Sequence, residues 1–143
     1  MYEKLNETSA SVMKRRFGKD CLYALATVDR DGAPHVRTVN GYYEDGCIYI
    51  ITYALSQKMA QLAHDSRAAV SGDWFTASGR GRSIGPLLAP ENQRLADTLR
   101  DAFSAWYGNG HINESDPNTV ILEIRLQSGL LFDHGSRYEI DFT

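Results

Sequence analysis

The chain has 143 residues, of which 43% are hydrophobic and 23% are charged, and its formal net charge at pH 7 is -3. A chain of this length and composition predicts one globular domain, here residues 1–143, with a substantial buried core. The small negative charge argues against a disordered chain and against a nucleic-acid partner, because nucleic-acid binding usually needs a strongly basic surface.

The first 20 residues are polar and charged, and no stretch is apolar for long enough to cross a bilayer. We therefore expect a cytoplasmic protein without a membrane partner. Cys21 and Cys47 lie in apolar stretches that lack CxxC spacing and a neighbouring histidine. This pattern predicts buried thiols and no metal site.

The first half of the chain predicts a helix followed by strands. Residues 3–17 form a weakly amphipathic pattern typical of a helix. Segments 21–28, 34–43 and 47–53 are rich in β-branched and aromatic residues, and the turn sequences DRDGA and EDG separate them. They predict an antiparallel meander. The strand at 21–28 is apolar on both alternating faces, so we expect barrel closure to cover one face and a second subunit or a helix to cover the other.

The chain continues with a short helix over 56–65, in which Ser56 is the expected N-cap, and with a fourth strand over 68–75. The next sequence, TASGRGRSIG, is either a fifth strand with glycine bends or a loop. Residues 79–85 and 108–118 are interpreted as loops within the domain.

The most secure helix starts at Pro90 and ends at Gly108 or Gly110. Its apolar stripe consists of Leu95, Leu99, Ala102, Phe103 and Trp106. Segments 118–127 and 137–142 alternate between apolar and polar residues and predict two further strands. The elements together predict a mainly β fold, a barrel of six to seven antiparallel strands with flanking helices.

Lys58 lies in the first turn of the predicted short helix, where the helix dipole favours an acid. No acid precedes Asp65 in this segment. A phosphate at this end would accept hydrogen bonds from the free N–H groups, from the Ser56 hydroxyl and from the Lys58 ammonium. The alternative is an ordinary solvated lysine.

Arg37 lies in the middle of the second predicted strand, on the same alternating face as Val39. A buried guanidinium needs an anion, either an acidic side chain or a bound phosphate. A phosphate held jointly by Arg37 and the segment from Ser56 to Lys58 would explain both cations with one ligand. Thr52, at the end of the third strand, could add a hydroxyl.

The segment LATVDRDGAPHVRTVNGYYEDGCIYIIT...SQKMAQLAHDSRAAVSGDW, roughly residues 22–74, resembles the pyridoxamine 5'-phosphate oxidase-like proteins, which are FMN-binding split β-barrels. The resemblance implies that Arg37, Ser56 and Lys58 hold the phosphate of FMN and that Thr52 contacts it. It also implies a homodimer with FMN at the interface.

The same resemblance places the backbone of Thr38, Val39 and Asn40 along the flavin ring. Gln57 stands where true pyridoxamine-phosphate oxidases of the family commonly have an arginine beside the lysine, so one phosphate cation is missing. Trp74 could stack near the flavin or simply pack at the barrel rim. Those oxidases also have a longer C-terminal segment with arginines that recognise the substrate, whereas this sequence stops at RYEIDFT without it. The resemblance therefore favours FMN binding over vitamin B6 chemistry.

The resulting hypothesis is an FMN-dependent oxidoreductase that passes hydride from reduced nicotinamide, NAD(P)H, through FMN to an unidentified small acceptor. No side chain is an obvious acid or base, which suits hydride transfer at a flavin because that step depends on positioning. Two alternatives stay open: a flavin carrier or redox or stress sensor without turnover, and a split barrel that uses deazaflavin F420 or haem.

Overall fold

The computed structural model describes all residues of the chain, 1–143. The strands are β1 (Glu3–Lys4), β2 (Cys21–Val28), β3 (Pro34–Glu44), β4 (Cys47–Tyr53), β5 (Arg67–Gly72), β6 (Phe75–Pro86), β7 (Thr119–Asp133) and β8 (Ser136–Asp141). The helices are α1 (Glu7–Phe17), α2 (Gln57–His64), the 3-10 helix η1 (Pro90–Asn92), α3 (Gln93–Ala102) and α4 (Ser104–Tyr107). None of the helices is both long and apolar enough to cross a membrane.

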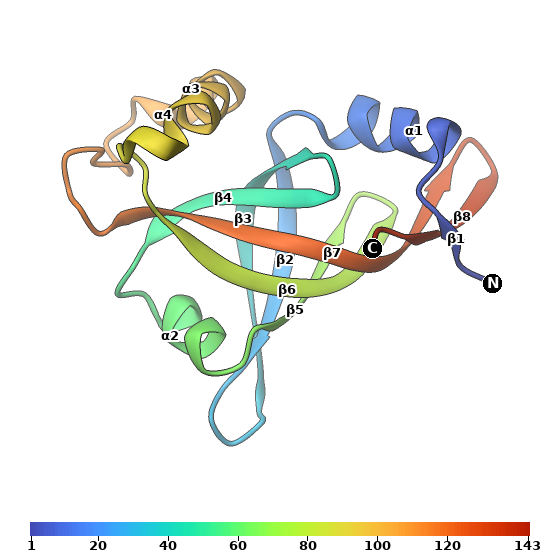
Figure 1. Cartoon of the computed structure of the whole chain (residues 1–143), viewed down its shortest axis with the longest axis horizontal. Helices are drawn as coiled ribbons and strands as arrows, with labels where there is room; N and C mark the ends of the chain where they lie inside the picture. Colours follow the sequence, from blue (N-terminus) through green and yellow to red (C-terminus); the bar gives the residue numbers. More distant parts are fainter.

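Six strands form a closed antiparallel barrel (Figure 1), in the order β7-β4-β3-β2-β5-β6, and β6 pairs back onto β7. This confirms the predicted mainly β barrel. β8 extends the sheet beyond β7, and the two-residue β1 pairs with β8 in parallel. The pairing between neighbouring strands is continuous around the barrel, but between β3 and β4 it covers only three residues of β3, Tyr42–Glu44.

The barrel interior holds the larger apolar core, and it is built by strict alternation along the strands. In β7 the inward residues Val120, Leu122, Ile124 and Leu126 are all buried. A second, smaller core lies outside the barrel, where α3 covers Ile121 of β7. Leu95, Leu99 and Phe103 of the predicted helical stripe are buried in it, so the prediction for this stripe is confirmed.

The opening helix is shorter than the sequence predicts, because it begins at Glu7 and not at residue 3. Asn6 caps it: the Asn6 Oδ1 atom accepts from the Ser9 N–H and the Ser9 Oγ atom accepts from the Asn6 N–H, each at 3.0 Å. These reciprocal bonds satisfy helix-terminal donors and fix the start of the helix. The residues before Asn6 are therefore free to pair with β8, and Leu5 N–H donates to the Asp141 carbonyl at 3.0 Å.

Of the two alternatives for TASGRGRSIG, the fifth strand is confirmed, because these residues belong to the long strand β6. The interpretation of residues 79–85 as a loop is wrong. Gly79 and Gly81 are buried and face inward, while Arg80 and Arg82 are exposed. A side chain at Gly81 would stand 2.9 Å from Ile124 and 3.1 Å from Leu62 of α2. Glycine is thus required here by close packing within a strand, and not by a turn.

Two neighbouring predictions have different outcomes. The fourth strand ends at Gly72 and not at residue 75, because Trp74 adopts a left-handed backbone conformation, with φ of 54°, in the β5–β6 turn. Residues 108–118 contain no helix or strand, as predicted.

Candidate functional site

Arg37 of β3 and Lys58 of α2 form a pair of cations at one end of the barrel. Both side chains are half-buried, and neither has a carboxylate within 4.0 Å. Burial lowers the pKa of Lys58, and the charge of Arg37 lowers it further. Burial also lowers the pKa of Arg37. Two like charges that repel each other, without an acid between them, are typical of a site for an external anion.

The start of α2 provides further donors beside Lys58. Ser56 has the extended backbone of an N-cap, with φ of -72° and ψ of 159°, but its hydroxyl does not cap the helix. The Lys58 Nζ atom lies 3.5 Å from the Ser56 Oγ atom, and the first turn contains no acid. The hydroxyl, the ammonium and the first N–H groups of the helix are therefore free to bind an anion.

Thr52 and Gln57 flank this cation pair along the chain. Thr52 is half-buried near the end of β4, on the same alternating set as Ile48 and Ile50 of the barrel core. Gln57 is exposed as the first residue of α2. Thr52 thus lies on the strand that precedes α2, and Gln57 lies at the start of the helix beside Lys58.

The barrel is split next to Arg37. β3 pairs with β2 along its length from Pro34 to Gly41, but its pairing with β4 covers only Tyr42–Glu44. The β4 segment Ile50–Tyr53 pairs with β7 alone. The edge of β3 that would face it is therefore unpaired, and unpaired backbone N–H and C=O groups need partners. We term this opening the β3–β4 split.

The stretch Thr38–Asn40 lies along the β3–β4 split. Val39 points inward and is buried, whereas Thr38 is exposed on the outer face. The Asn40 side chain donates to the Asp20 Oδ1 atom at 2.9 Å, and Trp106 of α4 donates to the other Asp20 oxygen at 2.9 Å. This bond fixes the Asn40 side chain toward Asp20, while the β3 backbone edge of this stretch is unpaired and free to contact a ligand.

Trp74 lies away from the cation pair in this chain. It is 72% exposed in the β5–β6 turn, and its ring packs edge-on against Phe132 with centroids 6.2 Å apart. α2 leads into the first residue of β5, while Trp74 follows the last one. The six-residue strand β5 therefore separates Trp74 from α2 and Lys58.

Sequence reasoning missed two residues that contact Arg37. Thr27 of β2 accepts from the Arg37 Nη1 atom at 2.7 Å, and the Gln61 Oε1 atom of α2 accepts from Nη2 at 3.2 Å. The sequence holds one signal for them, a polar residue on an otherwise apolar face. Gln61 lies between Met59 and Leu62 on the buried face of α2, and Thr27 lies on the inward face of β2.

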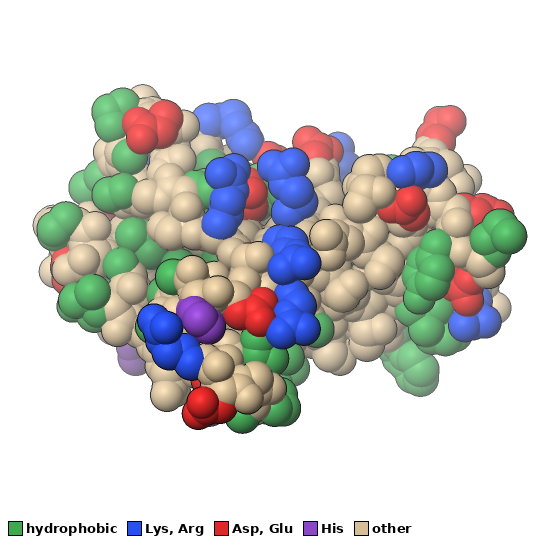
Figure 2. Space-filling model, turned by 60° about the horizontal axis from the view of Figure 1, so that its bottom comes forward, with side chains coloured by type: hydrophobic (Ala, Val, Ile, Leu, Met, Phe, Trp, Pro, Cys, Tyr) green, Lys and Arg blue, Asp and Glu red, His purple; other side chains and the backbone are tan.

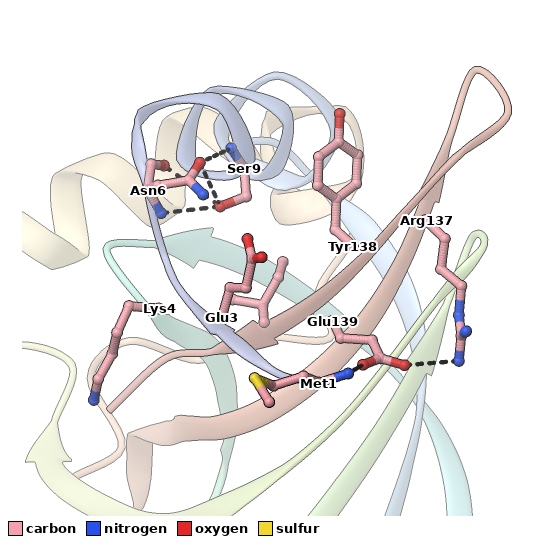
Figure 3. Close-up of a pocket in the computed structure, with 9 residues that line it drawn as sticks. Met1, Glu3, Lys4, Asn6, Ser9, Arg137, Tyr138 and Glu139 are labelled. Atoms are coloured by element: carbon pink, nitrogen blue, oxygen red, sulfur yellow. Dashed lines mark hydrogen bonds and ion pairs between the residues drawn. The ribbon is translucent and has the colours of Figure 1, made fainter.

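A small cavity of about 250 Å³ lies at the other end of the molecule, between β1, the start of α1 and β8 (Figure 3). Its polar groups bind one another: the N-terminal amine contacts Glu139 at 2.6 Å, and Arg137 contacts the same carboxylate at 2.9 Å. These charges are paired, so this cavity does not offer the free cations found beside α2.

Arginines also gather on the outside of the barrel, and Figure 2 shows a band of basic side chains across this face, with acidic ones beside them. In register, Arg80 of β6 stands between Arg67 of β5 and Arg125 of β7. Arg67 is bonded to Asp65, and Arg125 lies 3.7 Å from Glu123. This exposed band is therefore partly neutralised, unlike the Arg37–Lys58 pair.

Comparisons with known proteins identify the family and the fold of the chain. Residues 13–132 match the family model described as "Pyridoxamine 5'-phosphate oxidase". A curated relative, pyridoxine/pyridoxamine 5'-phosphate oxidase of Rhizobium etli, is 33% identical over 82 residues, which cover 56% of this chain and 37% of the relative. The chain thus spans little more than a third of the length of the curated relatives it matches.

Two solved structures show the same fold at low sequence identity. A FAD-binding protein from Mesorhizobium loti is 18% identical, with a TM-score of 0.64, over 89% of this chain and 94% of that one. A heme binding protein from Mycobacterium smegmatis is 19% identical, with a TM-score of 0.65, over 87% of this chain and 54% of that one. The barrel therefore has a fold that also occurs in proteins with different bound groups.

Proposed function

The chain belongs to the pyridoxamine 5'-phosphate oxidase family, and from this premise we propose that it binds flavin mononucleotide and acts as an oxidoreductase. The observation that carries the proposal is the cation pair without an acid, Arg37 and Lys58, beside the β3–β4 split. A phosphate dianion fits this pair, because it supplies the missing negative charge and accepts several hydrogen bonds at once.

Each group of the site has a specific role in this proposal. Arg37, Lys58, Ser56 and the start of α2 hold the phosphate, with Thr52 and Gln57 beside it. The unpaired backbone edge of Thr38–Asn40 offers hydrogen bonds to the flavin ring. A bound flavin supplies hydride chemistry, here from reduced nicotinamide to a small acceptor. The chain contributes binding and orientation, which suits a site without an evident acid or base.

We further propose a homodimer that completes the site. The outer face of β2 and β3 is apolar and open: Leu22 is 63% exposed and Val36 is 70% exposed. A hollow of about 490 Å³ continues this face over β5 and β6, and Ala24, Ala26 and Ala69 are among its lining residues. An apolar surface of this kind is typical of subunit contacts, and Thr38, opposite Ala24 in register, borders it.

The first experiment identifies the bound group. The absorbance spectrum of the freshly purified protein should show the two visible and near-ultraviolet bands of an oxidised flavin. A Soret band instead would favour haem, the group named for the M. smegmatis neighbour, and a spectrum of deazaflavin type would favour F420.

The second experiment tests the phosphate site. Arg37→Ala and Lys58→Ala should each raise the dissociation constant for FMN by about 10- to 100-fold, because a hydrogen bond to a charged group contributes about 1.5–3 kcal/mol. The dissociation constant for riboflavin, which lacks the phosphate, should change by less than about 3-fold. Arg30→Ala, at an exposed arginine without an ion pair, is the control. Equal losses for both ligands would contradict the phosphate role.

Turnover is tested separately from binding. Stopped-flow mixing of the FMN-loaded protein with NADH or NADPH should bleach the flavin absorbance if the protein is an oxidoreductase of this kind. Tight FMN binding without reduction would instead favour a flavin carrier or redox sensor.

A further inference from the structure

We propose that Thr27 and Gln61 are positioning residues that orient Arg37 through neutral oxygen atoms and so keep its charge available for a phosphate. This inference rests on the proposed function, because it assigns a role toward the same anion. Neither residue is exposed enough to contact solvent freely: Thr27 is 2% exposed and Gln61 is 7% exposed.

The three groups form a closed hydrogen-bonded triangle. The Thr27 hydroxyl donates to the Gln61 Oε1 atom at 2.5 Å. That same hydroxyl oxygen accepts from Arg37 Nη1 at 2.7 Å, while Gln61 Oε1 accepts from Arg37 Nη2 at 3.2 Å. The Leu25 carbonyl also accepts from Nη1, at 3.2 Å. A planar guanidinium held at both terminal nitrogens has its orientation fixed.

All three acceptors are neutral, and this distinguishes Arg37 from most arginines of the chain. The arginines without a carboxylate within 4.0 Å are Arg30, Arg37 and Arg80. Of these, Arg30 and Arg80 are exposed, where water solvates the charge. Arg37 alone is both shielded and unpaired, so its charge is compensated by oriented dipoles only.

Thr27 and Gln61 are polar residues at buried positions, and packing alone would favour apolar residues there. Thr27 alternates with Tyr23 and Leu25 on the buried face of β2, and Gln61 lies beside Met59 and Leu62. A buried polar side chain stabilises the fold less than an apolar one of similar size, unless its hydrogen bonds are made. Here those bonds are made to Arg37, which explains why polar residues stand at these positions.

A carboxylate at position 61 would orient Arg37 equally well but would also neutralise it. The amide of Gln61 has nearly the same shape and carries no charge, so an incoming phosphate does not have to compete with an internal anion. The Gln61→Glu variant therefore separates orientation from charge. It replaces the amide nitrogen by an oxygen and leaves the packing volume almost unchanged.

The test compares Gln61→Glu with Gln93→Glu, which makes the same change in net charge at an exposed site on α3. We expect Gln61→Glu to raise the dissociation constant for FMN by about 10- to 100-fold and that for riboflavin by less than about 3-fold. Inorganic pyrophosphate should raise the melting temperature of the flavin-free wild type and of Gln93→Glu, but not of Gln61→Glu. Wild-type-like FMN and pyrophosphate binding in Gln61→Glu would overturn the inference.

Thr27→Val and Thr27→Ser provide a second pair that does not depend on the folding of Gln61→Glu. Valine matches threonine in shape but removes the hydroxyl, so it should weaken FMN by about 10-fold, and serine should restore most of the affinity. Equal affinities in the two variants would overturn the role of Thr27.

Different results would contradict the positioning role of Thr27 and Gln61 and the proposed function. If the wild type prefers FMN over riboflavin and Arg37→Ala removes this preference, while Gln61→Glu and Thr27→Val do not, only the positioning role is wrong. If the wild type shows no preference for FMN and no response to pyrophosphate, the proposed function and the positioning role are both wrong.

Discussion

At the residue scale, Lys58 is a side chain whose charge opposes stability and supports binding. Burial and the neighbouring Arg37 both lower its pKa from the ordinary value of 10.5. In the ligand-free protein, the charge of Lys58 is therefore fully destabilising below this lowered pKa, and the destabilising contribution decreases above it until it disappears near the ordinary value of 10.5. Binding has the opposite sign, because a phosphate needs the charged form.

Lys58→Met should therefore stabilise the flavin-free protein while weakening FMN. We expect the free energy of unfolding to rise by about 0.5–2 kcal/mol, the usual gain from removing a functional but strained group. Chemical denaturation without flavin measures this change. Lys19→Met, at an exposed lysine in the turn before β2, should leave the stability nearly unchanged. A lower free energy of unfolding in Lys58→Met than in the wild type would contradict a destabilising effect of the Lys58 charge.

The same lowered pKa predicts the pH dependence of binding. The affinity of the wild type for FMN should fall as the pH rises through the pKa of Lys58, and it should do so below the pH at which an ordinary lysine loses its proton. Fluorescence titrations between about pH 7 and 10.5 would measure this fall. In Lys58→Met the affinity should be low but flat over the same range, and a parallel fall in both proteins would exclude Lys58 as the titrating group.

At the element scale, the position of α2 depends on glycine in β6. Gly81 lets Leu62 of α2 and Ile124 of β7 approach the strand, at 3.1 Å and 2.9 Å from where a Cβ would stand. Gly81→Ala should destabilise the protein by about 1–3 kcal/mol, a typical cost of overpacking. Gly108→Ala is the control, because a Cβ added there would meet nothing within 4 Å and the φ of Gly108 is not positive. Thermal unfolding of both variants tests this.

Asp65, which follows α2, should contribute to the loss of stability of the fold at acid pH. Asp65 accepts from the Arg67 guanidinium at 2.6 Å and from the Arg67 N–H at 3.1 Å, and these bonds lower its pKa from 3.8 to about 2. Because the folded-state pKa is the lower one, this stabilising contribution is complete above about pH 4 and is lost toward pH 2. Asp65→Asn should therefore flatten the dependence of the urea midpoint on pH in this window, whereas Asp31→Asn should not.

The elements themselves were largely predictable because their patterns are local. Alternation of apolar residues along residues 118–127 and the stripe of the helix that starts at Pro90 identify their buried faces directly. The GRGR sequence left a strand and a loop as alternatives, because glycine often ends a strand. Its alternation with arginine has the period of a strand, and this is the alternative that the structure shows. β1 could not be predicted, because a two-residue strand has no periodicity and exists only through its partner β8.

The candidate site was predictable only in part, because some of its residues have no local signal in the sequence. Lys58 and Arg37 were noticed because each conflicts with its local surroundings, and the structure brings them together. Thr27 and Gln61 act through contacts between residues 34 positions apart, which no local pattern shows. The β3–β4 split depends on register between strands, and the sequence does not specify where that pairing ends.

At the scale of the whole molecule, ligand binding and folding are linked. A ligand that binds only the folded state stabilises it, and FMN at 100 times its dissociation constant should add about 2.7 kcal/mol to the free energy of unfolding. In Arg37→Ala, whose dissociation constant should be about 10- to 100-fold higher, the same FMN concentration should add only about 0.4–1.4 kcal/mol. An unchanged melting temperature of the wild type with FMN would argue against specific binding.

The apolar outer face makes a prediction about assembly. Val36 is 70% exposed in the centre of this face, opposite Ala26 in register. If the proposed homodimer buries this face, a charge at position 36 would have to be buried with it, so Val36→Asp should convert the proposed dimer into monomers. Sedimentation equilibrium measures the change, and Leu88→Asp, at a leucine that is 53% exposed before η1, should leave the dimer intact.

The same variant tests whether the partner completes the flavin site. Thr38 stands one residue after Arg37 and borders the apolar face, so a ligand that spans from the phosphate site to this face would contact both subunits. In that case monomeric Val36→Asp should bind FMN at least about 10-fold more weakly than the wild type, although Arg37 and Lys58 are untouched. Wild-type FMN affinity in a proven monomer would place the whole site within one chain.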